Sequence, residues 1–190
     1  MFSSANQAWC TRWTTFNSIQ EQLGREYNLD PCCLEETAKC DNFLTPKQDM
    51  FTIKNPLQRF EKETEIQMFV NPEYGRNQRK FVEHVADWCE YDNVIADVLI
   101  PARTDTALFH DVILPRATGV YFIKGRITFG SNEYWEMLWE KEYLDNGKKN
   151  SLYQKHGKMS AAPFPSMIVS FGGDSDFEYG TLKLDKESYD

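Results

Sequence analysis

The sequence contains no long apolar segment. Nowhere do about 18 or more apolar residues follow one another, so we expect no membrane-spanning helix. A secretory leader is also missing, because the first residues, MFSSANQAWCTRW, are polar and aromatic instead of charged and then apolar. These two absences predict a cytoplasmic protein with no membrane partner.

The paired cysteine motifs of zinc sites are missing as well. The five cysteines stand at positions 10, 32, 33, 40 and 89, and no two of them have C-x-x-C spacing. Their odd number and the missing leader favour reduced thiols over disulfides. We therefore expect neither a metal site nor a disulfide framework.

Positive charge is scarce over the whole chain. There are 21 Lys and Arg residues against 29 Asp and Glu residues, which gives a formal net charge of −8. A protein that is held on nucleic acid mainly by charge needs clustered Lys and Arg. The composition therefore argues mildly against nucleic-acid binding, unless the basic residues gather on one face.

Apolar residues, in contrast, are plentiful. The chain is 41% hydrophobic and 14% aromatic, which is enough material for a sizeable core. A length of 190 residues predicts one domain. We assign residues 1–173 to this domain and expect the acidic residues 174–190 to form a loose tail.

Apolar runs alternate with helical periodicity along the chain. Compact apolar runs predict buried strands, and apolar residues three or four positions apart predict helices. A further strand is expected to end before Pro31. The predicted strands are 66–70, 94–100, 120–123, 126–129 and 167–171, with 120–129 as a hairpin, and the predicted helices are 14–27, 77–91 and 104–113. This alternation indicates an α/β fold with a mostly parallel sheet flanked by helices.

Two of the predicted strands end at a polar residue that is followed by proline. The first strand ends at Asp30-Pro31, and Asn71-Pro72 directly follows strand 66–70. Ligands of open α/β sheets bind beyond the carboxyl ends of the strands. We therefore expect both pairs at one edge of the sheet, around a common site.

The sequence Asn71-Pro72-Glu73-Tyr74 suits the binding of a planar amine. The side-chain oxygen of Asn71 and the carbonyl of Pro72 are acceptors that can converge on an exocyclic NH₂ group. Tyr74 offers a flat ring for base stacking, a contact that contributes roughly 1–3 kcal/mol. A base of duplex DNA reaches such a loop only when it is flipped out. Taken alone, however, these four residues are more typical of a turn after a strand.

Longer segments resemble the phage-type DNA N6-adenine methyltransferase (Dam-like) family. The run LIPARTDTALFH at 99–110 is similar to a strand and loop of this family, and FIKGRITFG at 122–130 and APFPSMIVSF at 162–171 are similar to two later segments. FSSANQAWCTRW and NLDPCCLEETAKC resemble its N-terminal segments. The resemblance keeps the same order over residues 2–172.

The resemblance implies a Rossmann-like S-adenosylmethionine-dependent methyltransferase fold. It implies methyl transfer to the N6 amine of adenine, with S-adenosylmethionine as the cofactor, DNA as the partner and the host cytoplasm as the location of a phage-encoded chain. Asn71, Pro72 and Tyr74 match the catalytic motif of the family. The implied cofactor-binding residues are Trp9, Thr11, Asp30, Pro31, Cys32 and Asp49. The oligomeric state stays open.

The chain departs from the family pattern at position 73, which is Glu where the family usually has Pro. Glu73 places a carboxylate beside a site that would approach DNA phosphates, and Arg76, Arg79 or Lys80 could neutralise its charge. This departure leaves two alternatives open. The chain could be a catalytically impaired or inactive methyltransferase-like binding protein, or it could methylate a different planar amine or amide.

Residues 130–162 are a candidate target-recognition insertion, because they include a locally basic stretch in an otherwise acidic chain. Arg103 lies after strand 94–100 and is a candidate phosphate ligand. The substrate-binding residues that we predict are Glu73, Arg76, Arg103, Lys148 and Lys149.

Overall fold

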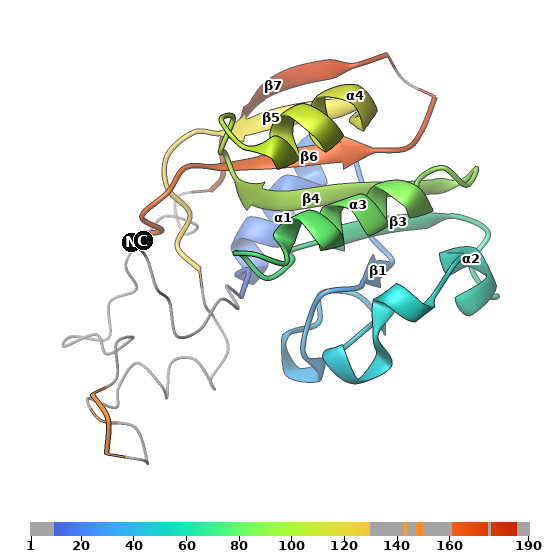
Figure 1. Cartoon of the computed structure of the whole chain (residues 1–190), viewed down its shortest axis with the longest axis horizontal. Coiled ribbons are helices and arrows are strands. Elements are labelled where there is room, and N and C mark those ends of the chain that lie inside the picture. The colour runs from blue at the N-terminus through green and yellow to red at the C-terminus, as the bar shows by residue number, and fades with distance from the viewer. Residues whose placement is uncertain (1–9, 130–142, 144–146, 150–160, 175, 186–190) are drawn as a thin grey trace.

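The computed structural model describes residues 10–129, 143, 147–149, 161–174 and 176–185. Figure 1 shows a sheet with helices on either side of it. The helical elements are α1 (Trp13–Leu23), η1 (Glu35–Thr37), η2 (Pro46–Gln48), η3 (Met50–Thr52), α2 (Pro56–Arg59), α3 (Gln78–Trp88), η4 (Phe109–Ile113) and α4 (Leu114–Arg116). The strands are β1 (Leu29–Asp30), β2 (Asn42–Phe43), β3 (Ile66–Val70), β4 (Val94–Pro101), β5 (Gly119–Ile123), β6 (Ser166–Phe171) and β7 (Glu178–Leu182).

The strands form one sheet in the order β2-β1-β3-β4-β6-β5-β7. Strand β6 is antiparallel to both of its neighbours, β4 and β5, whereas all the other pairs are parallel. The expected α/β fold with a mostly parallel sheet is therefore confirmed. Six strands, all except β6, therefore end at one edge of the sheet, and ligands of open α/β sheets bind at such an edge.

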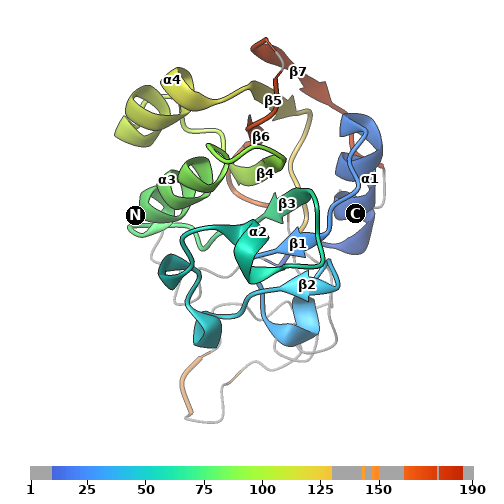
Figure 2. The ribbon, with the colours of Figure 1, turned by 90° about the vertical axis from the view of Figure 1, so that its right-hand side faces the viewer.

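Two hydrophobic cores lie on opposite faces of the sheet. Met68, Val98 and Val169 belong to the core under α3, and Phe69, Leu99 and Ile168 belong to the core under α1. Figure 2 shows α3 and α4 on one side of the sheet and α1 on the other. Because both faces are covered, β3, β4 and β6 are buried along almost their whole length and are mostly apolar instead of alternating.

The helices are close to the predicted ranges but shorter. Helix α1 ends before Gly24, which adopts a left-handed conformation (φ 61°), so the predicted extension to residue 27 is wrong. Helix α3 lies within the predicted 77–91 and buries Val82, Val85 and Trp88. The predicted helix at 104–113 is in part a π-helical turn, Phe109–Ile113, which continues into α4.

Two predictions near the C-terminus are wrong. Residues 126–129 form no hairpin with β5, because β6 and β7 occupy both of its sides. Ile127 and Phe129 are buried in the core under α1 instead. Part of the expected loose tail is the strand β7, whose Leu182 is buried in the same core.

The connection from β5 to β6 begins and ends at one edge of the sheet. The two strands are adjacent and antiparallel, with Phe122 opposite Met167. At the start of the connection, the backbone N–H of Lys124 donates to the carbonyl of Leu182 (2.9 Å). At its end, the carbonyl of Pro165 accepts from the N–H of Ala102 (2.9 Å). The chain therefore leaves and re-enters the sheet at fixed, neighbouring points.

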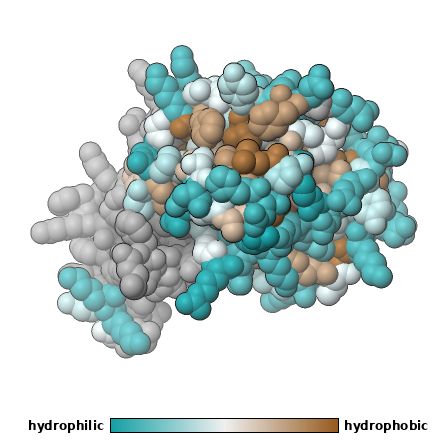
Figure 3. Space-filling model, turned by 45° about the horizontal axis from the view of Figure 1, so that its top comes forward, coloured by the Kyte–Doolittle hydropathy of each residue, from teal (hydrophilic) through white to brown (hydrophobic). Residues whose placement is uncertain are grey.

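A small apolar patch remains on the surface. Leu114 and Phe122 are among the exposed large apolar side chains. Figure 3 shows a group of apolar residues, surrounded by hydrophilic ones, on the side of the molecule that carries β5, β7 and α4. Within the described ranges, no helix combines the length and the apolar character that a membrane span requires.

Candidate active site

A cavity of about 440 Å³ opens at the carboxyl ends of β1 and β3. Four loops and the first turn of α3 build its wall. The lining residues are Cys10, Thr11, Asp30–Leu34, Thr37, Lys39, Leu44–Pro46, Asp49–Phe51, Phe69, Asn71–Glu73, Asn77, Lys80 and Phe81. The structure thus brings Asp30-Pro31 and Asn71-Pro72 to one cavity, where the sequence placed them.

Asp30 holds the loop after β1 in shape. Its side chain is buried, and its two oxygens accept hydrogen bonds from the backbone N–H groups of Cys32 (3.3 Å) and Lys39 (3.1 Å). Burial raises the pKa of Asp30 to about 6, although these two hydrogen bonds oppose the rise. Both bonds are local, so the carboxylate determines the course of the cavity wall.

Asn71 faces the N-terminal segment. Its side-chain Nδ2 donates to the hydroxyl of Thr11 (3.1 Å), and Thr11 is buried. This bond fixes the plane of the amide, so Oδ1 points away from Thr11. Pro72 is buried directly behind Asn71. The loop therefore presents an amide of defined orientation at the cavity.

Glu73 also lines the cavity. Its Oε1 accepts a hydrogen bond from Nδ2 of Asn77 (2.6 Å), one helical turn further along the chain. Two of the three cations that could neutralise Glu73 have other partners. Arg79 pairs with Glu83 (2.7 Å) and Asp111 (3.2 Å), and the Nζ of Lys80 lies 3.7 Å from the centre of the Phe51 ring.

Asp49 occupies the turn between η2 and η3. Its backbone has φ 36°, a left-handed conformation that is uncommon for residues other than glycine. Its Oδ1 accepts from the N–H of Phe51 (3.2 Å), which begins η3 and turns Phe51 toward Phe81, at a ring distance of 4.9 Å. Backbone strain of this kind is common at ligand sites.

Sequence analysis did not predict the aromatic and cationic part of the wall. Phe51, Phe81 and Lys80 form one group there. Lys39 also lines the cavity, and its Nζ lies 4.7 Å from the ring centre of Trp13, which is not a lining residue. Lys39 is buried and donates to the carbonyl of Thr37 (2.8 Å). Phe81 lies in the predicted helix 77–91, whereas Lys39 and Phe51 lie in loops without a periodic pattern.

Several predicted site residues lie away from the cavity. Tyr74 is buried, packs edge-on against Phe129 and Phe164 at ring distances of 6.1 and 5.5 Å, and donates to the carbonyl of Leu99 (3.4 Å). Four exposed cations do not line the cavity: Arg76, Arg103, Lys148 and Lys149. Trp9, predicted to bind the cofactor, lies outside the described residues.

The thiols of Cys32 and Cys40 have raised pKa values. Burial is the largest cause that raises the pKa of Cys32, and the nearby charges of Asp30 and Glu73 add to it. Burial likewise raises the pKa of Cys40 to about 12. Such thiols are poor nucleophiles and poor metal ligands at neutral pH. Among the described residues, no group of three or more His, Cys, Asp or Glu side chains is arranged to hold a metal ion.

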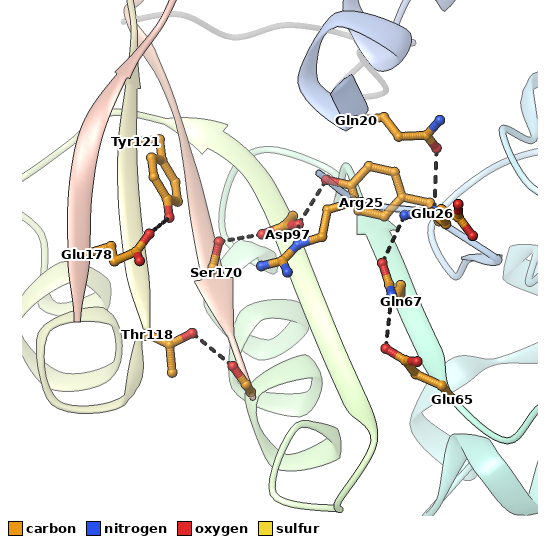
Figure 4. Close-up of polar contacts among 12 residues, drawn as sticks. Gln20, Arg25, Glu26, Glu65, Gln67, Asp97, Thr118, Tyr121, Ser170 and Glu178 are labelled. Atoms are coloured by element: carbon orange, nitrogen blue, oxygen red, sulfur yellow. Dashed lines mark hydrogen bonds and ion pairs between the residues drawn. The ribbon is translucent and has the colours of Figure 1, made fainter. Parts of the chain in front are cut away.

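A second buried carboxylate, Asp97, lies on the face of the sheet that α1 covers. It accepts from the Arg25 Nε (2.9 Å), the Tyr27 hydroxyl (2.9 Å) and the Ser170 hydroxyl. Figure 4 shows these side chains converging from the segment after α1, from β4 and from β6. Burial, followed by the charge of Asp97, raises the pKa of Tyr27 well above its usual value. This cluster fastens elements together and does not border the cavity.

Fold and cavity together define a Rossmann-like methyltransferase architecture with its site at the carboxyl edge of the sheet. A comparison with protein families matches residues 2–160 to the family DNA N-6-adenine-methyltransferase (Dam). The chain therefore belongs to the Dam family. It is similar to the DNA N-6-adenine-methyltransferase of Haemophilus phage HP1 (strain HP1c1), with 26% identity over 168 residues, 88% of this chain and 87% of that protein.

Proposed function

We propose that the protein transfers a methyl group from S-adenosylmethionine to the N6 amine of a flipped-out adenine in DNA. One observation carries the proposal: the loop after β1 and the Asn71-Pro72 loop line the same cavity. Methyl donor and amine must meet within bonding distance, and a shared cavity is the arrangement that permits this. Membership of the Dam family supports the choice of reaction.

The cavity fits the cofactor by size and by chemistry. A volume of about 440 Å³ is in the range of small-molecule sites. The carboxylates of Asp30 and Asp49 can accept from hydroxyl and ammonium groups, and the ring of Phe51 can pack against a planar base. When bound, the cofactor supplies a methyl group on a positively charged sulfur. Thr11, Asp30, Pro31, Cys32 and Asp49 are the residues that we expect to hold it.

Asn71 and Pro72 act on the other reactant. Oδ1 of Asn71 and the carbonyl of Pro72 accept from the two N–H groups of the amine, which directs the nitrogen lone pair toward the methyl group. The nitrogen would gain the methyl group and give up one proton to water, and the sulfur would keep the electron pair of the broken S–C bond. Thr11 holds the Asn71 amide in place, so the acceptor is oriented before the base arrives.

Contacts with the DNA backbone require residues that lie outside the cavity. We expect Arg76, Arg103, Lys148 and Lys149 to contact phosphates, which is where Arg and Lys contribute to affinity for DNA. The ring of Tyr74 becomes a platform for the flipped base only if it turns out of its contacts with Phe129 and Phe164.

The test is methyl incorporation from tritiated S-adenosylmethionine into unmethylated DNA. The unmodified protein is expected to incorporate label, and Asn71→Ala is expected to lower the rate on the order of 100-fold or more, as loss of one oriented group does in other enzymes. Asn17→Ala, an exposed position on α1, is the matched control and should keep its activity. Absence of incorporation by the unmodified protein, with cofactor binding intact, would favour the inactive alternative. Label on a free nucleotide or on a protein amide instead would favour a different acceptor.

A further inference from the structure

Glu73 carries a negative charge into the cavity at the point where the two reactants would meet. It follows Asn71 and Pro72 directly, and it lines the same cavity as the loop after β1. Its Oε1 is held by Asn77 (2.6 Å), so the side chain is fixed against the first turn of α3. This bond occupies one oxygen and leaves Oε2 for a ligand.

The charge of Glu73 acts on the loop after β1. It is one of the causes that raise the pKa of the Cys32 thiol, after burial and the charge of Asp30. Cys32 belongs to the loop that we assign to the cofactor, and Glu73 belongs to the loop that we assign to the amine. The carboxylate therefore acts on the space between the two loops.

The described wall of the cavity carries an excess of negative charge. Its ionisable acids are Asp30, Asp49 and Glu73, and its cations are Lys39 and Lys80. Lys39 donates to the carbonyl of Thr37, and Lys80 lies over the ring of Phe51. Asp30 and Asp49 accept from the backbone of their own loops. Glu73 differs from both, because its hydrogen-bond partner is the neutral side chain of Asn77.

Methyl transfer removes the positive charge from the sulfur of the donor. S-adenosylmethionine has a positively charged sulfur, and the product, S-adenosylhomocysteine, has a neutral thioether with the rest of the molecule unchanged. A fixed carboxylate near the sulfur attracts S-adenosylmethionine and interacts only weakly with S-adenosylhomocysteine. A group that acts on the ammonium or carboxylate of the cofactor would affect both molecules equally.

We propose that Glu73 determines the preference of this cavity for the cationic methyl donor over its neutral product. The inference rests on the proposed function, because it takes the cavity to be the cofactor site. It also gives a role to the residue at which this chain departs from the pattern of its family. The carboxylate strengthens binding before transfer and releases the product after it.

Calorimetric titration of the full chain with each of the two molecules tests the proposal. Glu73→Gln keeps the size of the side chain and an acceptor for Asn77, but removes the charge. We expect this variant to bind S-adenosylmethionine about 10-fold more weakly and S-adenosylhomocysteine almost unchanged, as a charge–charge contact in a partly solvated site predicts. Glu21→Gln, exposed on α1, changes the net charge equally and should alter neither affinity.

The other outcomes overturn the proposal in distinguishable ways. Equal weakening of both molecules by Glu73→Gln would show that the charge acts on a group they share. Unchanged affinity for both would show that it acts on neither. If the unmodified protein binds neither molecule, the proposed function fails first, and the inference fails with it. A second measurement separates a folding defect from these outcomes, because the exposed Glu73 should leave the melting temperature unchanged when replaced.

Discussion

Two aspartates are buried in this sheet, and they have opposite kinds of partner. Asp97 in β4 is held by side chains from distant parts of the chain, Arg25, Tyr27 and Ser170. Asp30 at the end of β1 is held by the backbone of the loop that follows it. A carboxylate with side-chain partners joins elements, whereas one with backbone partners shapes a loop. We therefore assign stability to the Asp97 cluster and the cavity wall to Asp30.

The largest effect is expected when Asp97 is replaced by Ala. The change leaves Arg25, Tyr27 and Ser170 without their common acceptor, and breaking such a buried pair destabilises by about 3–5 kcal/mol. Urea unfolding measures the loss. Asp87→Ala is the matched control, because the Asp87 carboxylate is exposed and pairs with Arg116, a contact that contributes about 1 kcal/mol or less. If the two variants lost equal stability, the role of Asp97 as a fastening point would be refuted.

Asp30 should give a smaller effect that depends on pH. Its pKa is about 6 in the folded protein and 3.8 as a free side chain, so its contribution to stability is fully present below pH 3.8 and is lost as the pH rises through 6. Relative to Asp30→Asn, which does not ionise, the unmodified protein should gain up to about 3 kcal/mol between pH 7 and pH 4. Unfolding curves of both proteins across this range measure the gain. A constant difference between them would mean that the Asp30 carboxylate does not titrate in this window.

The smallest effect is expected at Tyr74, and it tests whether this residue belongs to the core or to the site. Tyr74→Phe keeps the ring and removes only the hydroxyl bond to the carbonyl of Leu99, which is long at 3.4 Å. We expect a loss of about 1 kcal/mol or less in the free energy of unfolding. Methyl incorporation should stay within a few-fold of the unmodified protein, because a flat ring remains for stacking. A loss as large as that of Asn71→Ala would place the hydroxyl in the chemistry instead.

The features that follow from local sequence were predictable. The apolar runs of β3, β4 and β6 and the periodicity of α3 identify these elements, because both faces of the sheet and one face of the helix must be buried. Asp30 and Asn71 were placed at one edge by the rule that parallel strands end together. Family resemblance, and not periodicity, supplied the reaction.

The features that depend on tertiary packing were not predictable. The position of β5 between β6 and β7 depends on two strands far away in the sequence. Tyr74 was expected at the site because of its neighbours in the chain. Its ring packs against Phe129 and Phe164 in the core instead. Lys39 and Phe51 reach the cavity from irregular loops, whose course no local pattern determines.

The length of the connection between β5 and β6 can change without changing the cavity. It leaves the sheet at the end of β5, beside β7, and re-enters at the start of β6, beside β4. Both ends are anchored by backbone hydrogen bonds, so its length does not alter the register of any strand. Doubling the length of a loop costs only about 0.6 kcal/mol in closure entropy. Segments from relatives can therefore be exchanged between residues 129 and 161, outside the buried core residues Ile127, Phe129 and Ala162, while the cavity keeps its lining. We therefore expect an exchange in this connection to leave the cavity at the ends of β1 and β3 unchanged.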